Sequence, residues 1–209
     1  MGVPNPGNSP VEQVQSGEWL IGLEGWVIPD GNYDDFAVGQ KRHFAEQLWS
    51  MEGLSASRDR TKRAVLRPDR RYELNGHVVY RSRAVSVIDF GLLGYVDENV
   101  KIDPDADSIA GTVYLGVDPF FYADDFAKQL GVPAAIYSWA VKEIWAETGP
   151  MISVRRGLLR RVAYVQRDPR RLSWLPVNST SDGPGDGTWG SFILRCQLEN
   201  QAPTYGPKV

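Results

Sequence analysis

The chain lacks the residues and segments that would place it in several large classes of protein. Its 209 residues include one cysteine, which excludes an intramolecular disulfide. The two histidines, His43 and His77, do not have the spacing of a metal-binding pair. No apolar run approaches the roughly 20 residues that cross a bilayer, and residues 1–17 lack the basic and apolar regions of a signal peptide. We expect a cytoplasmic protein without membrane association, metal or cofactor.

Motifs of the common enzyme classes are missing as well. The sequence has no G-x-S-x-G and no P-loop. Residues 30–34 and 103–107 each begin like a calcium loop, but neither has the glycine and glutamate that such a loop needs further along. Whether the protein is an enzyme therefore stays open at this stage.

Charge is small in total but unevenly distributed. The net charge is −3, which gives no general attraction to nucleic acid. Residues 58–83 hold nine basic residues against three acids, residues 89–125 hold nine acids against one lysine, and residues 155–171 hold seven arginines against one acid. Such blocks either pair with one another across the fold or gather to bind an anion. The candidate anion-binding residues are Arg67, Arg70, Arg71, Arg155, Arg156, Arg160 and Arg161.

Short β-prone runs bounded by turn residues dominate the sequence. Seven tryptophans and nine tyrosines suit a β-rich core. Asn75-Gly76 stands between two such runs and predicts a hairpin turn. We expect a mostly β fold: one antiparallel barrel or sandwich of about eight or nine strands with one or two short helices. The alternative is an α+β fold in which residues 133–147 form a helix, because that segment has both helical and strand periodicity.

A repeated string suggests how the chain is organised. YDDFA occupies residues 33–37 and YADDFA occupies residues 122–127. The surrounding segments, about 25–53 and 113–149, share the same order of features, which indicates a weak internal duplication. We expect strands after both copies, and each string to be a structural corner whose aromatic side chains point inward.

The expected boundaries are a flexible lead at residues 1–16, a single β-rich domain at 17–200 and a tail at 201–209. Within the domain, three carboxyls stand among apolar or aromatic neighbours, where burial is costly unless the charge is paired. They are Glu143, Glu24 and Glu46. The aromatic residues that could line a ligand cavity are Tyr137, Trp139, Trp145 and Trp26.

Three functional hypotheses follow. The leading one is a non-catalytic binding or protein-interaction protein that holds a small apolar ligand in an aromatic-lined barrel interior. The second is a cavity-type enzyme, such as an isomerase, cyclase or lyase, that uses one buried carboxylate. The third is an anion or nucleic-acid binder acting through the arginine-rich segments, of which we expect nucleic-acid binding to be absent. The oligomeric state is open.

Overall fold

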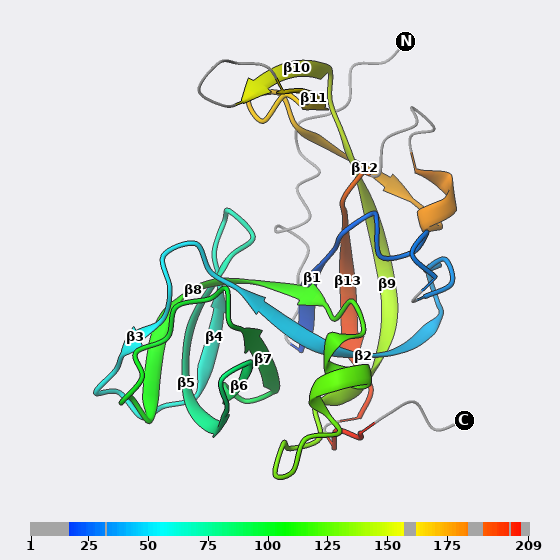
Figure 1. Ribbon diagram of the computed structural model, residues 1–209. Coiled ribbons are helices and arrows are strands. Elements are labelled where there is room, and N and C mark those ends of the chain that lie inside the picture. Colours follow the sequence, from blue (N-terminus) through cyan, green and yellow to red (C-terminus); the bar gives the residue numbers. More distant parts are fainter. Residues whose placement is uncertain (1–16, 32, 157–161, 184–189, 201, 206–209) are drawn as a thin grey trace.

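The computed structural model describes residues 17–31, 33–156, 162–183, 190–200 and 202–205 (Figure 1). The expected N-terminal lead lies outside these residues. The strands are β1 (Glu18–Leu23), β2 (Lys41–Trp49), β3 (Ser55–Ala56), β4 (Arg63–Leu66), β5 (Tyr72–Arg81), β6 (Val85–Asp89), β7 (Leu93–Asp97), β8 (Ser108–Val117), β9 (Ile136–Thr148), β10 (Met151–Arg156), β11 (Val162–Arg167), β12 (Ser173–Val177) and β13 (Phe192–Leu198). The helical turns in the described part are Tyr122–Phe126 and Thr180–Asp182.

Eight of the strands close into a β-barrel, in the order β1, β13, β9, β2, β7, β6, β5 and β8. The predicted mostly β fold is thereby confirmed. Most neighbours are antiparallel, but β1 meets β8 in parallel at Gly22 and Gly116, and β2 meets β7 in parallel at Glu46 and Gln47. Strands β3, β4 and β12 extend the same sheet, while β10 and β11 form a separate hairpin that projects from the barrel in Figure 1.

Strands β2 and β8 connect two halves of the molecule. Residues 41–45 of β2 pair with β9, whereas residues 46–49 pair with β8. Residues 108–113 of β8 pair with β5, and residues 114–117 pair with β2. Figure 1 accordingly shows β3 to β7 on one side and β1, β9, β12 and β13 on the other, with β2 and β8 running between them. The two halves face one another across the outer surface of β1 and β8.

The barrel interior is filled by the chain's own side chains. Phe44 and Leu48 of β2 are buried with Trp139 of β9 in one hydrophobic cluster. The rings of Phe44 and Trp139 stack with their centroids 5.6 Å apart. Burial of such large aromatic surfaces is a main source of folding free energy.

Residues 133–147 do not form the helix of the alternative prediction, because Ile136–Thr148 is strand β9. It pairs with β2, β12 and β13, so neighbouring strands take up its backbone groups on both edges. Tyr137, Trp139 and Val141 all belong to the barrel core. Pairing and burial of alternate residues therefore override the helix propensity of this segment.

Both copies of the repeated string are corners with their aromatic residues turned inward. Phe36 and Tyr122 are buried, while the aspartates of the two strings are exposed. The second copy forms a short helical turn whose first N–H groups are bound by Asp118: its carboxylate accepts from the backbone N of Tyr122 (3.0 Å) and of Ala123 (3.4 Å). The Asp118 side chain thus binds the first N–H groups of the turn, although the residue at the N-cap position is Phe121.

The two corners also touch one another. The ring of Tyr33 contacts that of Phe120 with centroids 4.6 Å apart. The Tyr33 hydroxyl donates to the backbone oxygen of Asp118 at 2.9 Å. After the corners, β2 and β9 pair in antiparallel fashion, with Lys41 opposite Ala140. The similar segments are thus neighbours in space as well as similar in sequence.

The hairpin turn predicted at Asn75-Gly76 is wrong, because both residues lie inside β5. The Asn75 amide donates to the backbone oxygens of Asp59 (3.0 Å) and Thr61 (2.5 Å), which holds the preceding loop against the strand. A Cβ at position 76 would lie 2.8 Å from the backbone oxygen of Asp89. Gly76 therefore serves a close approach of strands, which is the other common use of a glycine in a strand.

The charged blocks pair with acids rather than standing alone. Lys62 in the first basic block binds Asp89 in the acidic stretch at 2.6 Å. Within the basic block, Arg63 binds Asp59 at 2.7 Å. All of these groups are partly or fully exposed, so each pair contributes little to stability.

The C-terminal segment also contacts the domain, since Thr204 exchanges two backbone hydrogen bonds with Ile136 of β9.

Candidate functional site

A cleft of about 750 Å³ lies between the two halves, on the outside of the barrel. Its volume is within the range of about 300–1,000 Å³ found for small-molecule sites. The aromatic residues that line it are Trp26, Trp49, Tyr114, Phe121, Trp174 and Phe192. The charged residues that line it are Glu24, Arg70, Asp97 and Glu147.

The floor of the cleft is open because it is made of glycine. Leu20 and Gly22 of β1, and Glu24 just after it, line the cleft, and Gly22 pairs with Gly116 of β8. Neither position adds a side chain above the sheet. A Cβ at Gly116 would have its nearest neighbours 3.8 Å away, at the backbone oxygens of Gln47 and Gly22, so the space above it is free. The absence of two side chains thus creates much of the cleft's depth.

The aromatic walls leave large rings in contact with solvent. Trp49 is 49% exposed and Tyr114 is 45% exposed. The two residues face one another in the β2–β8 pairing, where Trp49 is the direct partner of Tyr114. Exposed aromatic surface in a concave site is typical of ligand-binding regions, because a ligand that covers it removes apolar area from water.

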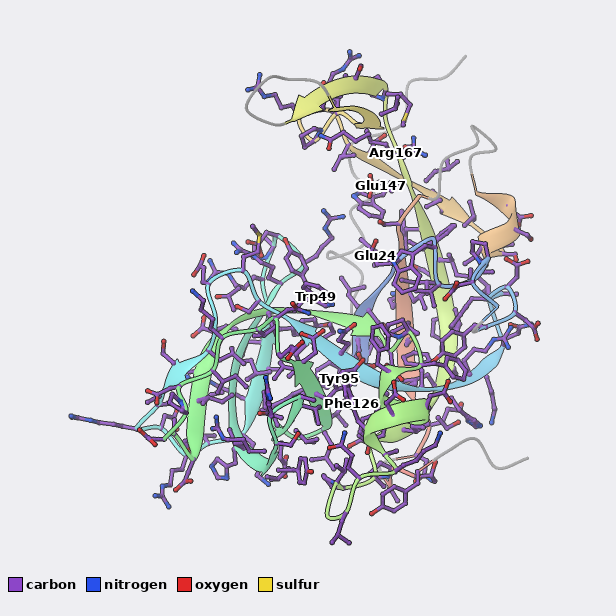
Figure 2. The ribbon with its side chains drawn as sticks, viewed as in Figure 1. Glu24, Trp49, Tyr95, Phe126, Glu147 and Arg167 are labelled. Carbon is purple, nitrogen blue, oxygen red and sulfur yellow. The ribbon has the colours of Figure 1, made fainter. Side chains whose placement is uncertain are left out.

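Two carboxyls, Glu24 and Glu147, stand on the wall near β13. Ser191 lies between them: its hydroxyl donates to Glu24 at 3.3 Å, and its backbone oxygen accepts from the N–H of Glu147 at 2.8 Å. Burial raises the pKa of Glu147, the nearby Arg167 opposes that rise, and the charge of Glu24 adds to it. The Nε of Arg167 is 3.9 Å from the Glu147 carboxylate. Figure 2 shows Arg167, Glu147 and Glu24 one below another.

Arg70 enters the cleft from a turn in which glycine is the usual residue. The backbone N of Arg70 donates to Arg67 at 2.9 Å, and the N of Arg67 donates to Arg71 at 2.8 Å. Arg70 is the last residue before Arg71 in this loop, and its φ of +67° lies in the left-handed region. In such short hairpin loops this position normally takes glycine, and a side chain there costs about 1 kcal/mol.

The Arg70 guanidinium lies over the indole of Trp174, with its Cζ atom 4.4 Å from the ring centroid. Its Nη1 atom is buried and has no hydrogen-bond partner among the described residues. Burial lowers the pKa of Arg70, although the group remains a cation at neutral pH. The carboxylate of the exposed Asp69 instead forms an ion pair with Arg71, at 2.6 Å. It also lies 4.0 Å from the Nε atom of Arg67.

Glu46 is placed inside the barrel, away from the cleft. Its side chain is 0% exposed, and neither carboxylate oxygen has a hydrogen-bond partner within the described residues. It shares the inward face of β2 with Phe44 and Leu48, and burial raises its pKa well above the ordinary value. The sequence suggested a buried carboxyl at this position, and Glu46 is indeed buried. A catalytic role for Glu46 stays a prediction.

Glu143 lies on the outer face of β9 and is held by two partners. The guanidinium of Arg195 donates to one oxygen, and the Trp145 indole N–H donates to the other at 3.2 Å. Arg195 also binds Glu18 at 3.4 Å. Trp145 is buried beneath the cleft against Leu20. These contacts make Glu143 part of an ion network beside the cleft.

The other predicted residues are scattered. Tyr137 and Trp139 fill the barrel core, while Trp26 lines the cleft. Arg155 and Arg156 lie on β10, but their side chains, together with Arg160 and Arg161, are outside the described part of the chain. Of the residues predicted from sequence, the cleft therefore brings together Glu24, Trp26 and Arg70.

Sequence reasoning missed Trp49, Tyr114, Glu147 and Trp174. A signal for one of them was present, because Glu147 follows Glu143 and Trp145 at alternate positions of a strand and so shares their face. The others come from distant segments, and only the strand pairing brings them to one cleft.

Comparisons with family models, with curated proteins and with solved structures find no match to this chain. Within the described ranges, no group of three or more histidine, cysteine, aspartate or glutamate residues could hold a metal ion. None of the described helices is long and apolar enough to cross a membrane. The geometry and chemistry of the cleft are therefore the basis for a functional proposal.

Proposed function

We propose that the protein is a binding protein that takes a small ligand with a flat, partly apolar body in the cleft between its two halves. The observation that carries this proposal is a cleft of about 750 Å³ walled by exposed aromatic rings. A ligand placed over Gly22 and Gly116 would cover aromatic residues that line the cleft, namely Trp26, Trp49 and Tyr114. Covering that apolar surface would supply most of the binding free energy.

The cleft supports this function better than the barrel interior does. Inside the barrel, Phe44, Leu48 and Trp139 are packed against one another, so a ligand would have to displace core side chains. Displacing close-packed core residues costs several kcal/mol, on the order of a large-to-small substitution. Outside, the floor at Gly116 is already free.

A second candidate function is acid–base catalysis in the same cleft. It is favoured by one observation: burial raises the pKa of Glu147 while a second carboxyl, Glu24, stands beside it. A carboxyl that holds its proton nearer neutral pH, next to one in a different environment, is the arrangement of a general acid and its partner base. In this second candidate function the acid and the base are Glu147 and Glu24. Of the carboxyls proposed from the sequence, it keeps Glu24 and leaves out Glu143 and Glu46.

A ligand screen with a matched pair of variants tests the binding function. Gly116→Val would place two methyl groups on the cleft floor, where the backbone leaves room for a side chain. Thr112→Val places the same side chain on the same face of β8, by exchanging a hydroxyl for a methyl group, at a position that does not line the cleft. Fragments detected by ligand-observed NMR should lose binding to Gly116→Val and keep it with Thr112→Val. Equal binding to both variants, or no binding fragment at all, would contradict the proposal.

A further inference from the structure

Arg70 is held in a backbone conformation that its residue type disfavours. In the described chain, only Arg70 and Phe120 combine a positive φ with a side chain. Phe120 has an evident packing role, since its ring contacts that of Tyr33 at 4.6 Å. Strain of this kind persists where the surroundings or a function require it. The turn itself would be satisfied by glycine, so the reason for Arg70 has to lie in its side chain.

The Arg70 side chain is positioned but incompletely bonded. Its flat face rests on Trp174 at 4.4 Å, which fixes the plane of the guanidinium. Its Nη1 atom has no hydrogen-bond partner among the described residues, and the nearby charges of Glu147 and Asp69 act on the guanidinium without a hydrogen bond to that atom. The neighbouring Asp69 is directed to Arg71 instead. A guanidinium that lies over an aromatic ring and has an unpartnered Nη1 can donate to the oxygens of a carboxylate or phosphate.

We infer that the ligand of the cleft carries a carboxylate or phosphate group, and that Arg70 binds its oxygens while Trp174 holds the guanidinium in place. This inference rests on the proposed binding function. The ligand's flat body would then lie toward Trp26 and the glycine floor. Hydroxyl or amide N–H groups of the ligand would face the oxygens of Glu24, farther along the same wall.

A cationic ligand fits this cleft less well, although aromatic rings and carboxyls often recognise amines. The ring of Trp174 already carries a guanidinium on its face. Arg70 is half-buried and contributes a positive charge at the cleft, which disfavours a second cation nearby. The Glu147 carboxylate is in turn close to Arg167, at 3.9 Å. The charges of Arg167 and Arg70 both oppose the rise in the pKa of Glu147 that burial causes, so this carboxylate already has cations near it.

A purely structural role for Arg70 makes a different prediction from a binding role. Arg70→Gly supplies the residue that the turn favours and removes the guanidinium. If Arg70 only contacted Trp174, this change would leave the ligand preference unchanged. If Arg70 binds the ligand, the melting temperature should stay near that of the wild type while the preference is lost. Arg70→Asn provides a second variant, because asparagine also tolerates the left-handed conformation.

The experiment compares three probes of the same shape: 2-naphthoate, 2-naphthyl phosphate and the neutral 2-naphthamide. Calorimetric titration at low ionic strength should show the wild type binding at least one of the two anions about tenfold or more tightly than the amide, as expected for hydrogen bonds to a charged group. Both Arg70 variants should bind all three probes as weakly as the amide. Arg71→Gln, which removes a charge outside the cleft, should keep the preference.

The outcomes separate the two proposals. No anion preference in the wild type, or a preference that survives in both Arg70 variants, overturns the role of Arg70. In that case the binding function survives if 2-naphthamide binds and Gly116→Val weakens it. If none of the three probes binds, both proposals fail. The relative affinity of the carboxylate and the phosphate identifies which oxyanion the site prefers.

Discussion

The guanidinium of Arg70 lies 4.4 Å from the ring centroid of Trp174, and this contact joins opposite ends of one sheet. Trp174 belongs to β12, the first strand of the sheet path, and Arg70 follows β4, the last. Leu66 at the end of β4 also packs near Trp174. The contact therefore brings the two halves together over the cleft, and the stability of the cleft's mouth should depend on both residues.

A double-mutant cycle measures that dependence. Trp174→Ala should lower the free energy of unfolding, and Arg70→Gly should change it by less than about 1 kcal/mol, because relief of the left-handed backbone offsets the lost cation–π contact. The coupling between the two changes should be about 0.5–1 kcal/mol. Urea denaturation of the four proteins gives the value. A coupling of zero would show that the two side chains do not interact in solution.

Glu46 should make stability depend on pH. Because burial raises its pKa in the folded state above the ordinary 4.5, the folded protein holds this proton more tightly than the unfolded chain does. The associated stability is complete below about pH 4.5 and is lost as pH rises toward the folded-state pKa, by up to about 1.4 kcal/mol per pH unit.

Glu46→Gln removes that titration and should gain stability relative to the wild type as pH rises from 4.5 to 8. Denaturant midpoints measured at several pH values test this expectation. Glu199→Gln is a suitable control, since Glu199 is paired with Lys41 near the surface. Parallel pH profiles for the wild type and Glu46→Gln would contradict the burial of the Glu46 carboxyl.

Two glycines should respond differently to the same change. A Cβ at Gly76 would lie 2.8 Å from the backbone oxygen of Asp89 and 2.9 Å from a methyl group of Ile88. Gly76→Ala should therefore lower the free energy of unfolding by about 1–3 kcal/mol. Gly116→Ala has 3.8 Å of clearance and should be nearly neutral. Thermal unfolding of both variants tests this difference. Similar losses of stability in the two variants would argue against the close approach of β5 and β6 at Gly76.

The acidic corner of the first repeated string should be structural. The Asp35 carboxylate accepts from the hydroxyl of Thr180 at 2.7 Å, and that hydroxyl accepts from the backbone N of Phe36 at 3.0 Å. Neither Asp34 nor Asp35 lines the cleft. The double change Asp34→Asn with Asp35→Asn should cost about 1 kcal/mol of stability and leave probe binding intact. Lost binding at an unchanged melting temperature would show a functional role instead.

Oligonucleotides should not bind. Arg71 is paired with Asp69 and Lys62 with Asp89, so part of the basic block is already neutralised. A titration of single- and double-stranded oligonucleotides at low and at moderate salt checks this, because phosphate contacts are strongest at low salt. Binding at low salt that weakens steeply with added salt would restore the arginine-rich segments as a nucleic-acid surface.

The sequence was sufficient for the mostly β fold class, since β-prone runs bounded by turn residues report directly on local structure. It misplaced the turn at Asn75-Gly76, because the same two residues can make a hairpin or allow a close approach of strands, and only the tertiary structure distinguishes these uses. The hairpin turn at Arg67 to Arg71 has no glycine to indicate it, because Arg70 occupies the left-handed position where glycine is usual.

The cleft could not be predicted from the pattern of residues. Its walls come from segments as far apart as Trp26, Trp49, Tyr114 and Trp174. Their meeting depends on the pairing of β1 with β8 and of β12 with β9, which no local signal reports. Of the aromatic residues in segment 133–149, Tyr137 and Trp139 belong to the barrel core and Trp145 packs with Leu20 and Ile193, which line the cleft.

The most direct test of a cleft-bound ligand is an NMR titration of the tryptophan side chains with 2-naphthoate. The chain has seven tryptophans, whose indole N–H signals can be assigned from single Trp→Phe variants. We expect the signals of Trp26, Trp49 and Trp174 to shift, while that of Trp139 in the barrel core stays in place. A shift of Trp139 with no change at the three cleft tryptophans, or no shift at any of them, would contradict the account.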